Sequence, residues 1–260
     1  MNLRPAEQSV RPSPIFLALL ALTAVGGVLA WRAGAAQPDN GPLAYAGVFT
    51  LVIAGWVVSL CLHEFGHAFT AWRFGDHDVA VRGYLSLNPF KYTNPLLSIG
   101  LPLLFIAMGG IGLPGGAVWV RTGGMPNWRR TVVSLAGPFM NLLLAVLLLG
   151  AARIFYHHGH SVFWSGIAFL GLLQVMAVVL NLIPIPPLDG YGALEPHLSP
   201  AVARSLEPLK QYGFFILLFI LIAPPLNGWF FSFVYKVYAA LGGIGQLASI
   251  GYGLTLFWHR

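Results

Sequence analysis

Residues 57–72 read VVSLCLHEFGHAFTAW, an apolar run with the pattern His-Glu-x-x-His in its middle. On a helix, side chains four positions apart lie on one face, so the imidazoles of His63 and His67 can bind a single ion. Glu64 lies one position further round, where its carboxylate can accept a proton from water at that ion. The alternative is that the two histidines have only a structural role and bind no ion. Ionisable groups in hydrocarbon are costly and usually functional, which favours a metal half-site.

The composition is that of an integral membrane protein. Of the 260 residues, 57% are apolar and 8% are charged, whereas soluble domains carry about a quarter charged residues. The net charge of +6 is spread over loops without a basic cluster. We therefore expect no nucleic-acid partner, and the charge marks cytoplasmic loops. Cys61 is the only cysteine, which excludes an intramolecular disulfide and indicates a packing residue.

Apolar runs predict an all-α polytopic fold with about five to six transmembrane helices. The first run, residues 15–31, favours an uncleaved span over a signal peptide, with its start in the cytoplasm. The second extends from residue 43 to about 74 and returns to the cytoplasm near Arg73. His67 and His63 would then lie about 9–15 Å below that surface.

Two further spans are expected at residues 131–154 and 161–183. Residues 214–224 and 229–258 form either two spans or one span and an interfacial helix. The whole chain, residues 1–260, is expected to be one membrane-embedded domain. Its catalytic core covers about residues 43–190, and C-terminal helices cover about 211–258.

A small membrane-associated β element is predicted between the second and third spans. Residues 79–87 alternate apolar and polar side chains, and a second short strand is indicated at 117–121. Between them, residues 95–114 are apolar but interrupted by proline and glycine, and basic residues flank both sides. This pattern favours a re-entrant or hairpin segment that returns to the cytoplasmic face.

A catalytic zinc ion takes three protein ligands and leaves one position for water. Asp189 is the acidic residue that combines membrane depth, the cytoplasmic side and a rigid approach. It follows a stretch with prolines at 184, 186 and 187, which cannot continue a helix. The alternative is that Asp189 only forms a turn with Gly190, since Asp-Gly is an ordinary turn pair.

Several motifs in order resemble the site-two proteases, zinc metalloproteases that cleave inside membranes. The matching segments are His63 to His67, Gly137-Pro138 with Asn141, and Asn181, Pro184, Pro187, Asp189 and Gly190. The chain is similar to the compact bacterial and archaeal branch without a PDZ or CBS domain. The resemblance implies that His63, His67 and Asp189 hold one zinc ion and that Glu64 is the general base. It also implies that Asn141 and Asn181 lie near the site and position the substrate backbone or shape the pocket.

We therefore expect a zinc metalloendopeptidase that hydrolyses peptide bonds within or near transmembrane segments, as in regulated intramembrane proteolysis. Its partners would be a transmembrane protein or peptide and the lipid bilayer, with the oligomeric state open. The expected location is a bacterial cell membrane, with the active site nearer the cytoplasm. Residues 79–87 could hold an extended substrate by strand addition, or could only pack on the helices. Remnant signal peptides are an alternative substrate. A metal transporter using the same cluster as a transit site, and a scaffold with a structural zinc, are the alternative functions.

Overall fold

The computed structural model describes residues 10–92, 120–256 and 258, and every regular element in these ranges is helical. Four helices are long and apolar enough to cross a membrane, and a bent fifth helix also qualifies if its halves form one span. The four are α1 (Pro14–Ala33), α2 (Pro42–Arg73), α5 (Asn127–Phe155) and α6 (Ser161–Asn181). The others are α3 (Asp78–Val81), α7 (Asp189–Leu194), the bent α8 (Pro200–Ile222), α9 (Leu226–Ala240) and α10 (Gly245–Thr255). The predicted polytopic helical fold is confirmed, with four to five candidate spans in the described ranges.

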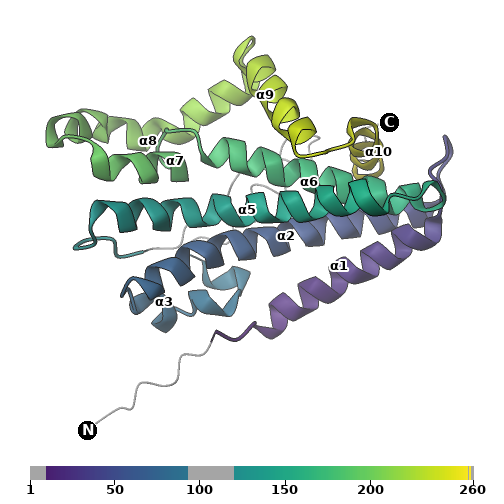
Figure 1. The fold of residues 1–260 in the computed structure, drawn as a ribbon, viewed down its shortest axis with the longest axis horizontal. Helices are drawn as coiled ribbons and strands as arrows, with labels where there is room; N and C mark the ends of the chain where they lie inside the picture. The colour runs from purple at the N-terminus through teal and green to yellow at the C-terminus, as the bar shows by residue number, and fades with distance from the viewer. Residues whose placement is uncertain (1–9, 93–119, 257, 259–260) are drawn as a thin grey trace, which may run out of the picture.

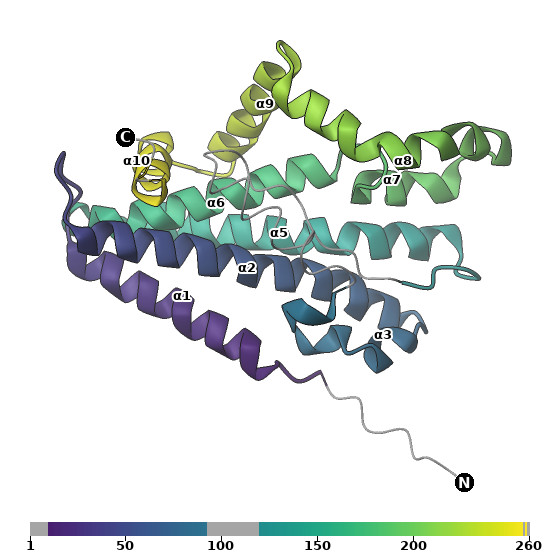
Figure 2. The same cartoon turned by 180° about the vertical axis from the view of Figure 1, so that it is seen from behind.

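The four long helices lie side by side along the longest axis of the molecule (Figure 1, Figure 2). Helices α3 and α7 lie at one end of this bundle, and α10 lies near the other end (Figure 1). The C-terminus of α2 and the N-terminus of α5 share the end that carries α3 and α7, which we call the site end. The chain therefore brings the second half of α2 and the segment after α6 to the same end of the bundle.

Local sequence sets where the spans begin and end. Ser13 caps α1 by accepting a hydrogen bond from the Phe16 N–H, and Pro14 occupies the first turn, where no N–H is needed. Gly34 follows α1 with a φ of 79°, a left-handed conformation that ends the helix at little cost. Ser199 caps α8 in the same way, through the N–H of Val202.

Burial separates central from peripheral helices. In the most apolar 18-residue stretch of each span, 83% of the residues are buried for α6 and 67% for α2, against 33% for α5 and 22% for α1. The outer faces of α1 and α5 expose large apolar side chains, among them Leu17, Val25, Phe139 and Leu147. A soluble protein rarely exposes so many in neighbouring positions, so these faces fit a lipid environment.

Glycines allow α2 to approach its neighbours closely. A Cβ on Gly66 would lie 2.7 Å from the backbone oxygen of Ala136 on α5, and a Cβ on Gly47 would overlap the backbone of α1 at Ala30. The α2–α5 contact therefore occurs within the metal-binding motif. It fixes the register in which α5 side chains meet the two histidines.

The predicted strand at residues 79–87 is wrong. Asp78–Val81 forms one helical turn, and Tyr84–Ser86 forms a 3-10 turn. The left-handed residues Gly83 (φ 79°) and Leu87 (φ 56°) interrupt any extended run. The alternation does not follow burial either, because Val79 is buried while Val81, two positions later, is 75% exposed.

The second predicted strand, 117–121, is described only at residues 120 and 121, which have no strand structure. The predicted re-entrant segment, residues 95–114, lies outside the described residues.

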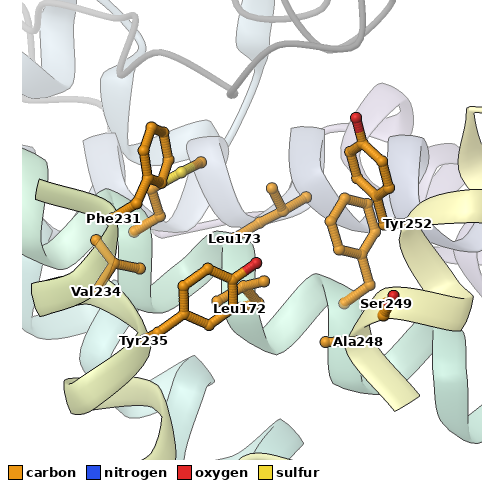
Figure 3. A pocket seen from close by; sticks show the side chains of 10 residues that line it. Leu172, Leu173, Phe231, Val234, Tyr235, Ala248, Ser249 and Tyr252 are labelled. Carbon is orange, nitrogen blue, oxygen red and sulfur yellow. The ribbon is translucent and has the colours of Figure 1, made fainter. Parts of the chain in front are cut away.

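The C-terminal region resolves into three helices. Pro224 and Pro225 separate α8 from α9, and Gly242 and Gly243 separate α9 from α10. The apolar run 229–258 is thus two short helices, neither of which meets the length for a span. With α6 they line an apolar cavity of about 360 Å³, and Tyr235 and Tyr252 are among its lining residues (Figure 3).

Candidate metal centre

Two histidines on α2 form the centre of the site. His63 and His67 are 6% and 8% exposed, and their Nε2 atoms lie 3.1 Å apart. Both Nδ1 atoms face α5, where His63 contacts Asn141 Oδ1 at 2.5 Å and His67 contacts the Val133 carbonyl oxygen at 2.7 Å. Because α2 and α5 are antiparallel, the earlier histidine meets the later α5 residue. The helix contact thus determines the orientation of both rings.

Asp189 approaches the two histidines from the other side. Its Oδ2 lies 3.2 Å from His63 Nε2, and its Oδ1 lies 3.3 Å from His67 Nε2. Helix α6 ends at Asn181, and the proline-containing segment that follows is not helical, as the sequence predicts. Asp189 itself is the first residue of the short helix α7, so it lies at a helix start instead of within an extended segment.

These three side chains form the one group of His, Cys, Asp and Glu residues with metal-ligand spacing in the part of the chain that the structure describes. The residues Asp76, His77 and Asp78, at the same end of the bundle, do not form such a group. Asp76 instead accepts hydrogen bonds from the backbone N–H groups of Asp78 and Arg121, and Asp78 pairs with the Arg121 guanidinium.

The donor chemistry of the three residues fits a zinc ion. Carbonyl oxygens only accept hydrogen bonds, so the proton of His67 is on Nδ1, and its Nε2 presents a lone pair to Asp189. Atoms about 2.0–2.1 Å from a tetrahedral zinc are about 3.3 Å apart, which matches the 3.1–3.3 Å separations. Asp189 Oδ2 is buried without a hydrogen bond from any described group. Electron-rich atoms thus face one another, and a cation would satisfy all of them.

Space for the ion is provided by Gly137 on α5. A Cβ at this position would lie 2.6 Å from His63 Nε2 and would overlap His67 Nε2. The hydrogen of glycine leaves open the region in front of both nitrogens. Gly137 is one of the residues that carry the resemblance to the site-two proteases, but its steric role is visible only in the structure.

Electrostatics favour the ionised form of Asp189. Burial raises the pKa of this carboxyl, but positive charge that faces it from the side of His67 and His63 outweighs burial and lowers the pKa below its ordinary value, as a bound cation also would. Asp189 is thus a carboxylate at neutral pH, which is the form that binds metal ions.

Glu64 is buried beside His63 on α2, with 3% of its surface exposed. Because Glu64 directly follows His63 on α2, the two side chains lie at about the same depth in the bundle. This placement is suited to proton transfer at the ion, because the group is close to the ligands without being part of the three-residue group.

The two asparagines differ in their relation to the site. Asn141 is 2% exposed and contacts His63 directly. Asn181 is buried at the last position of α6, and among the described residues no hydrogen bond joins it to His63, His67 or Asp189. The structure therefore joins Asn141, but not Asn181, to the three-residue group by a described hydrogen bond.

Sequence reasoning missed two polar residues behind Asn141. Its Nδ2 donates to Gln174 Oε1 at 2.8 Å, and Gln174 Nε2 donates to Ser59 Oγ at 3.0 Å. Gln174 lies in the middle of the apolar helix α6 and is completely buried. A polar residue deep in a membrane span is the signal that could have identified it.

The chain is similar to known proteins over nearly its whole length. Residues 51–159 match the sequence profile of peptidase family M50. The chain is 63% identical over 258 residues to a Mycolicibacterium smegmatis protein named as zinc metalloprotease Rip2, covering 99% of this chain and 98% of that protein. A Mycobacterium tuberculosis protein of the same name is 63% identical over 252 residues, covering 97% and 96% of the two chains.

A more distant relative is a Bacillus subtilis protein named as zinc metalloprotease YwhC. It is 32% identical over 175 residues, which are 65% of this chain and 78% of that protein. No solved structure is significantly similar to the chain.

Proposed function

The chain belongs to peptidase family M50, the site-two proteases, and from this premise we propose how its residues act as an intramembrane zinc metalloprotease. The observation that carries the proposal is the convergence of His63, His67 and Asp189 with ligand-like spacing beside a buried glutamate. The reaction is hydrolysis of a peptide bond within or near a transmembrane segment of a protein substrate, as part of regulated proteolysis.

In this proposal, His63, His67 and Asp189 are the protein ligands of one zinc ion. Zinc held there supplies a Lewis acid that polarises the scissile carbonyl and acidifies a water molecule. The residues of the chain supply the geometry. The Nδ1 contacts to Asn141 and Val133 keep the Nε2 lone pairs directed at the ion, and Gly137 keeps the position open.

Glu64 is the general base. Its carboxylate would accept the proton of the attacking water and pass it to the leaving amine. Asn141 positions His63, whereas for Asn181 we retain only a role in shaping the pocket at the end of α6.

The substrate is a membrane-spanning polypeptide in a lipid environment. The site lies between long apolar helices whose outer faces fit lipid, so a membrane-embedded chain can reach it by lateral diffusion. A helical substrate hides its carbonyl groups in hydrogen bonds, so it must unwind locally before hydrolysis. Strand addition to residues 79–87 is not part of this proposal, because that segment is not a strand.

We place the active site nearer the cytoplasm of a bacterial cell. Basic residues concentrate at the site end of the bundle, and the positive-inside rule assigns that end to the cytoplasm. They are Arg73, Arg82, Lys91, Arg121, Arg129 and Arg130. In a Cys61→Ala background, Arg82→Cys should react with an impermeant thiol reagent only in opened cells. Reaction in intact cells would reverse this orientation.

The alternative of a metal transporter has no support from the relatives, whose names describe proteases. Chemistry also favours the protease, because a transit site has no use for Glu64 as a base. We propose that residues 1–260 act as one membrane-embedded protease domain.

Cells that express either wild-type protein or Glu64→Gln provide the test. Single-span membrane proteins should accumulate uncleaved in the variant, and their shorter products should appear only with the wild type. Identical membrane proteomes would count against the proposed function.

A further inference from the structure

A continuous chain of buried hydrogen bonds connects His63 to the interior of the bundle. It passes from His63 Nδ1 through the Asn141 and Gln174 side-chain amides to Ser59 Oγ, with separations of 2.5, 2.8 and 3.0 Å. Ser59 Oγ in turn donates to the Trp56 carbonyl oxygen at 2.7 Å. The side chains come from α2, α5 and α6, and none is more than 6% exposed.

The direction of every bond in this chain follows from its far end. The Trp56 carbonyl can only accept, and Ser59 has one hydroxyl hydrogen, which it donates there. Ser59 must therefore accept from the Gln174 amide nitrogen, which turns the Gln174 oxygen toward Asn141. The Asn141 nitrogen donates to that oxygen, so its own oxygen faces His63.

This direction fixes the tautomer of His63. An oxygen opposite Nδ1 requires a hydrogen on Nδ1, which leaves the lone pair on Nε2, facing Asp189 and His67. If Asn141 rotated by 180°, its NH₂ group would face Nδ1 and the ring hydrogen would move to Nε2, where it blocks metal binding. Gln174 is the residue that prevents this rotation.

His67 shows the contrast. Its Nδ1 donates to the backbone carbonyl of Val133, so no side chain determines its tautomer. The two histidines thus present equivalent Nε2 atoms but depend on different supports. The support of His63 consists of side chains and can be removed by substitution.

We propose that Gln174 and Ser59 are positioning residues, which hold Asn141 in the orientation that keeps His63 competent to bind zinc. The inference rests on the proposed zinc site and extends it by two residues that do not touch the ion. The competing explanation is that the polar chain only joins three helices inside the membrane. The two explanations differ in what Asn141→Asp should do, because an aspartate has no NH₂ group and cannot present the wrong face to His63.

The test measures the zinc dissociation constant of the purified full-length protein by chelator competition, with thermal unfolding of the metal-free protein alongside. Gln174→Leu should weaken zinc binding by about 10- to 100-fold, the usual effect of losing an outer partner of a metal-binding histidine. Adding Asn141→Asp to Gln174→Leu should restore most of the affinity. Ser59→Ala is the milder variant if Gln174→Leu does not fold, and it should weaken binding in the same direction.

Ser165→Ala is the matched control. Ser165 is a fully buried polar residue on the same helix, its hydroxyl makes no hydrogen bond to the described residues, and its loss should leave zinc affinity unchanged.

Zinc affinity of Gln174→Leu within about twofold of the wild type would overturn the inference while leaving the zinc site intact. Failure of Asn141→Asp to restore affinity would overturn it in favour of helix joining. A wild-type protein that binds no zinc would overturn the proposed function and this inference with it.

Discussion

Gly137 faces His63 across the α2–α5 contact so closely that a Cβ on the glycine would lie 2.6 Å from His63 Nε2. The same Cβ would also overlap His67 Nε2. One absent methyl group therefore leaves room for an ion between two helices that otherwise pack tightly. The small size of Gly137 is therefore part of what forms the metal centre.

Gly137→Ala should reduce zinc affinity by about tenfold or more, because the methyl group occupies the region in front of both imidazoles. Zinc content of the purified protein checks this. Gly150→Ala lies on the same helix, where a Cβ would meet no atom within 4 Å, and it should retain wild-type zinc content. Equal zinc content in the two variants would refute the steric role of Gly137.

Asp189→Ala should remove bound zinc, because two histidines without the third ligand form an incomplete site. The measurement is the metal count per chain after dialysis against a weak chelator. Asp39→Ala is the control, since Asp39 is exposed beyond the opposite end of α2. If Asp189→Ala keeps one zinc per chain, Asp189 is a turn residue and the proposed ligand set is wrong.

Gly66→Ala should destabilise the protein by about 1–3 kcal/mol, because its methyl group would press against the Ala136 carbonyl and separate α2 from α5. Thermal unfolding in detergent measures the effect, and zinc content should fall as the helices separate. Gly228→Ala, on α9, has no atom within 4 Å of its Cβ and should unfold like the wild type. Unchanged unfolding of Gly66→Ala would show that α2 and α5 pack less closely than described.

Asp76→Ala should destabilise the site end by about 1–3 kcal/mol, because Asp76 is buried and accepts the backbone N–H groups of Asp78 and Arg121. Hydrogen exchange should become faster at residues 120–125. Asp78→Ala removes only the exposed pair with Arg121, which is worth about 1 kcal/mol or less. Equal effects of the two substitutions would contradict the distinction between buried and exposed contacts.

The sequence allowed the long helices and the histidine pair to be predicted because both depend on local patterns, whereas Asp189 was selected by comparing the acidic residues and by the family resemblance. Apolar runs gave α1, α2, α5 and α6 to within a few residues, and spacing along one helix identified His63 and His67 as a pair. The strand prediction failed because two left-handed residues, Gly83 and Leu87, turn the chain where alternation suggested an extended run. Periodicity alone does not reveal such turns.

Other features depend on contacts between distant segments. Gln174 lies 33 positions after Asn141 and 115 after Ser59, so its part in the hydrogen-bond chain follows only from the packing of α6 against α2 and α5. The same is true of Gly137, whose missing side chain matters only because two imidazoles face it.

The central claim is that His63, His67 and Asp189 hold the zinc with which Glu64 hydrolyses membrane-spanning substrates. The most direct measurement determines zinc content and cleavage of labelled single-span polypeptides in the same preparations of wild-type protein and Glu64→Gln. We predict about one zinc per chain in both proteins, and cleavage by the wild type alone. A wild-type protein without zinc, or a Glu64→Gln protein that cleaves as fast as the wild type, would contradict the account.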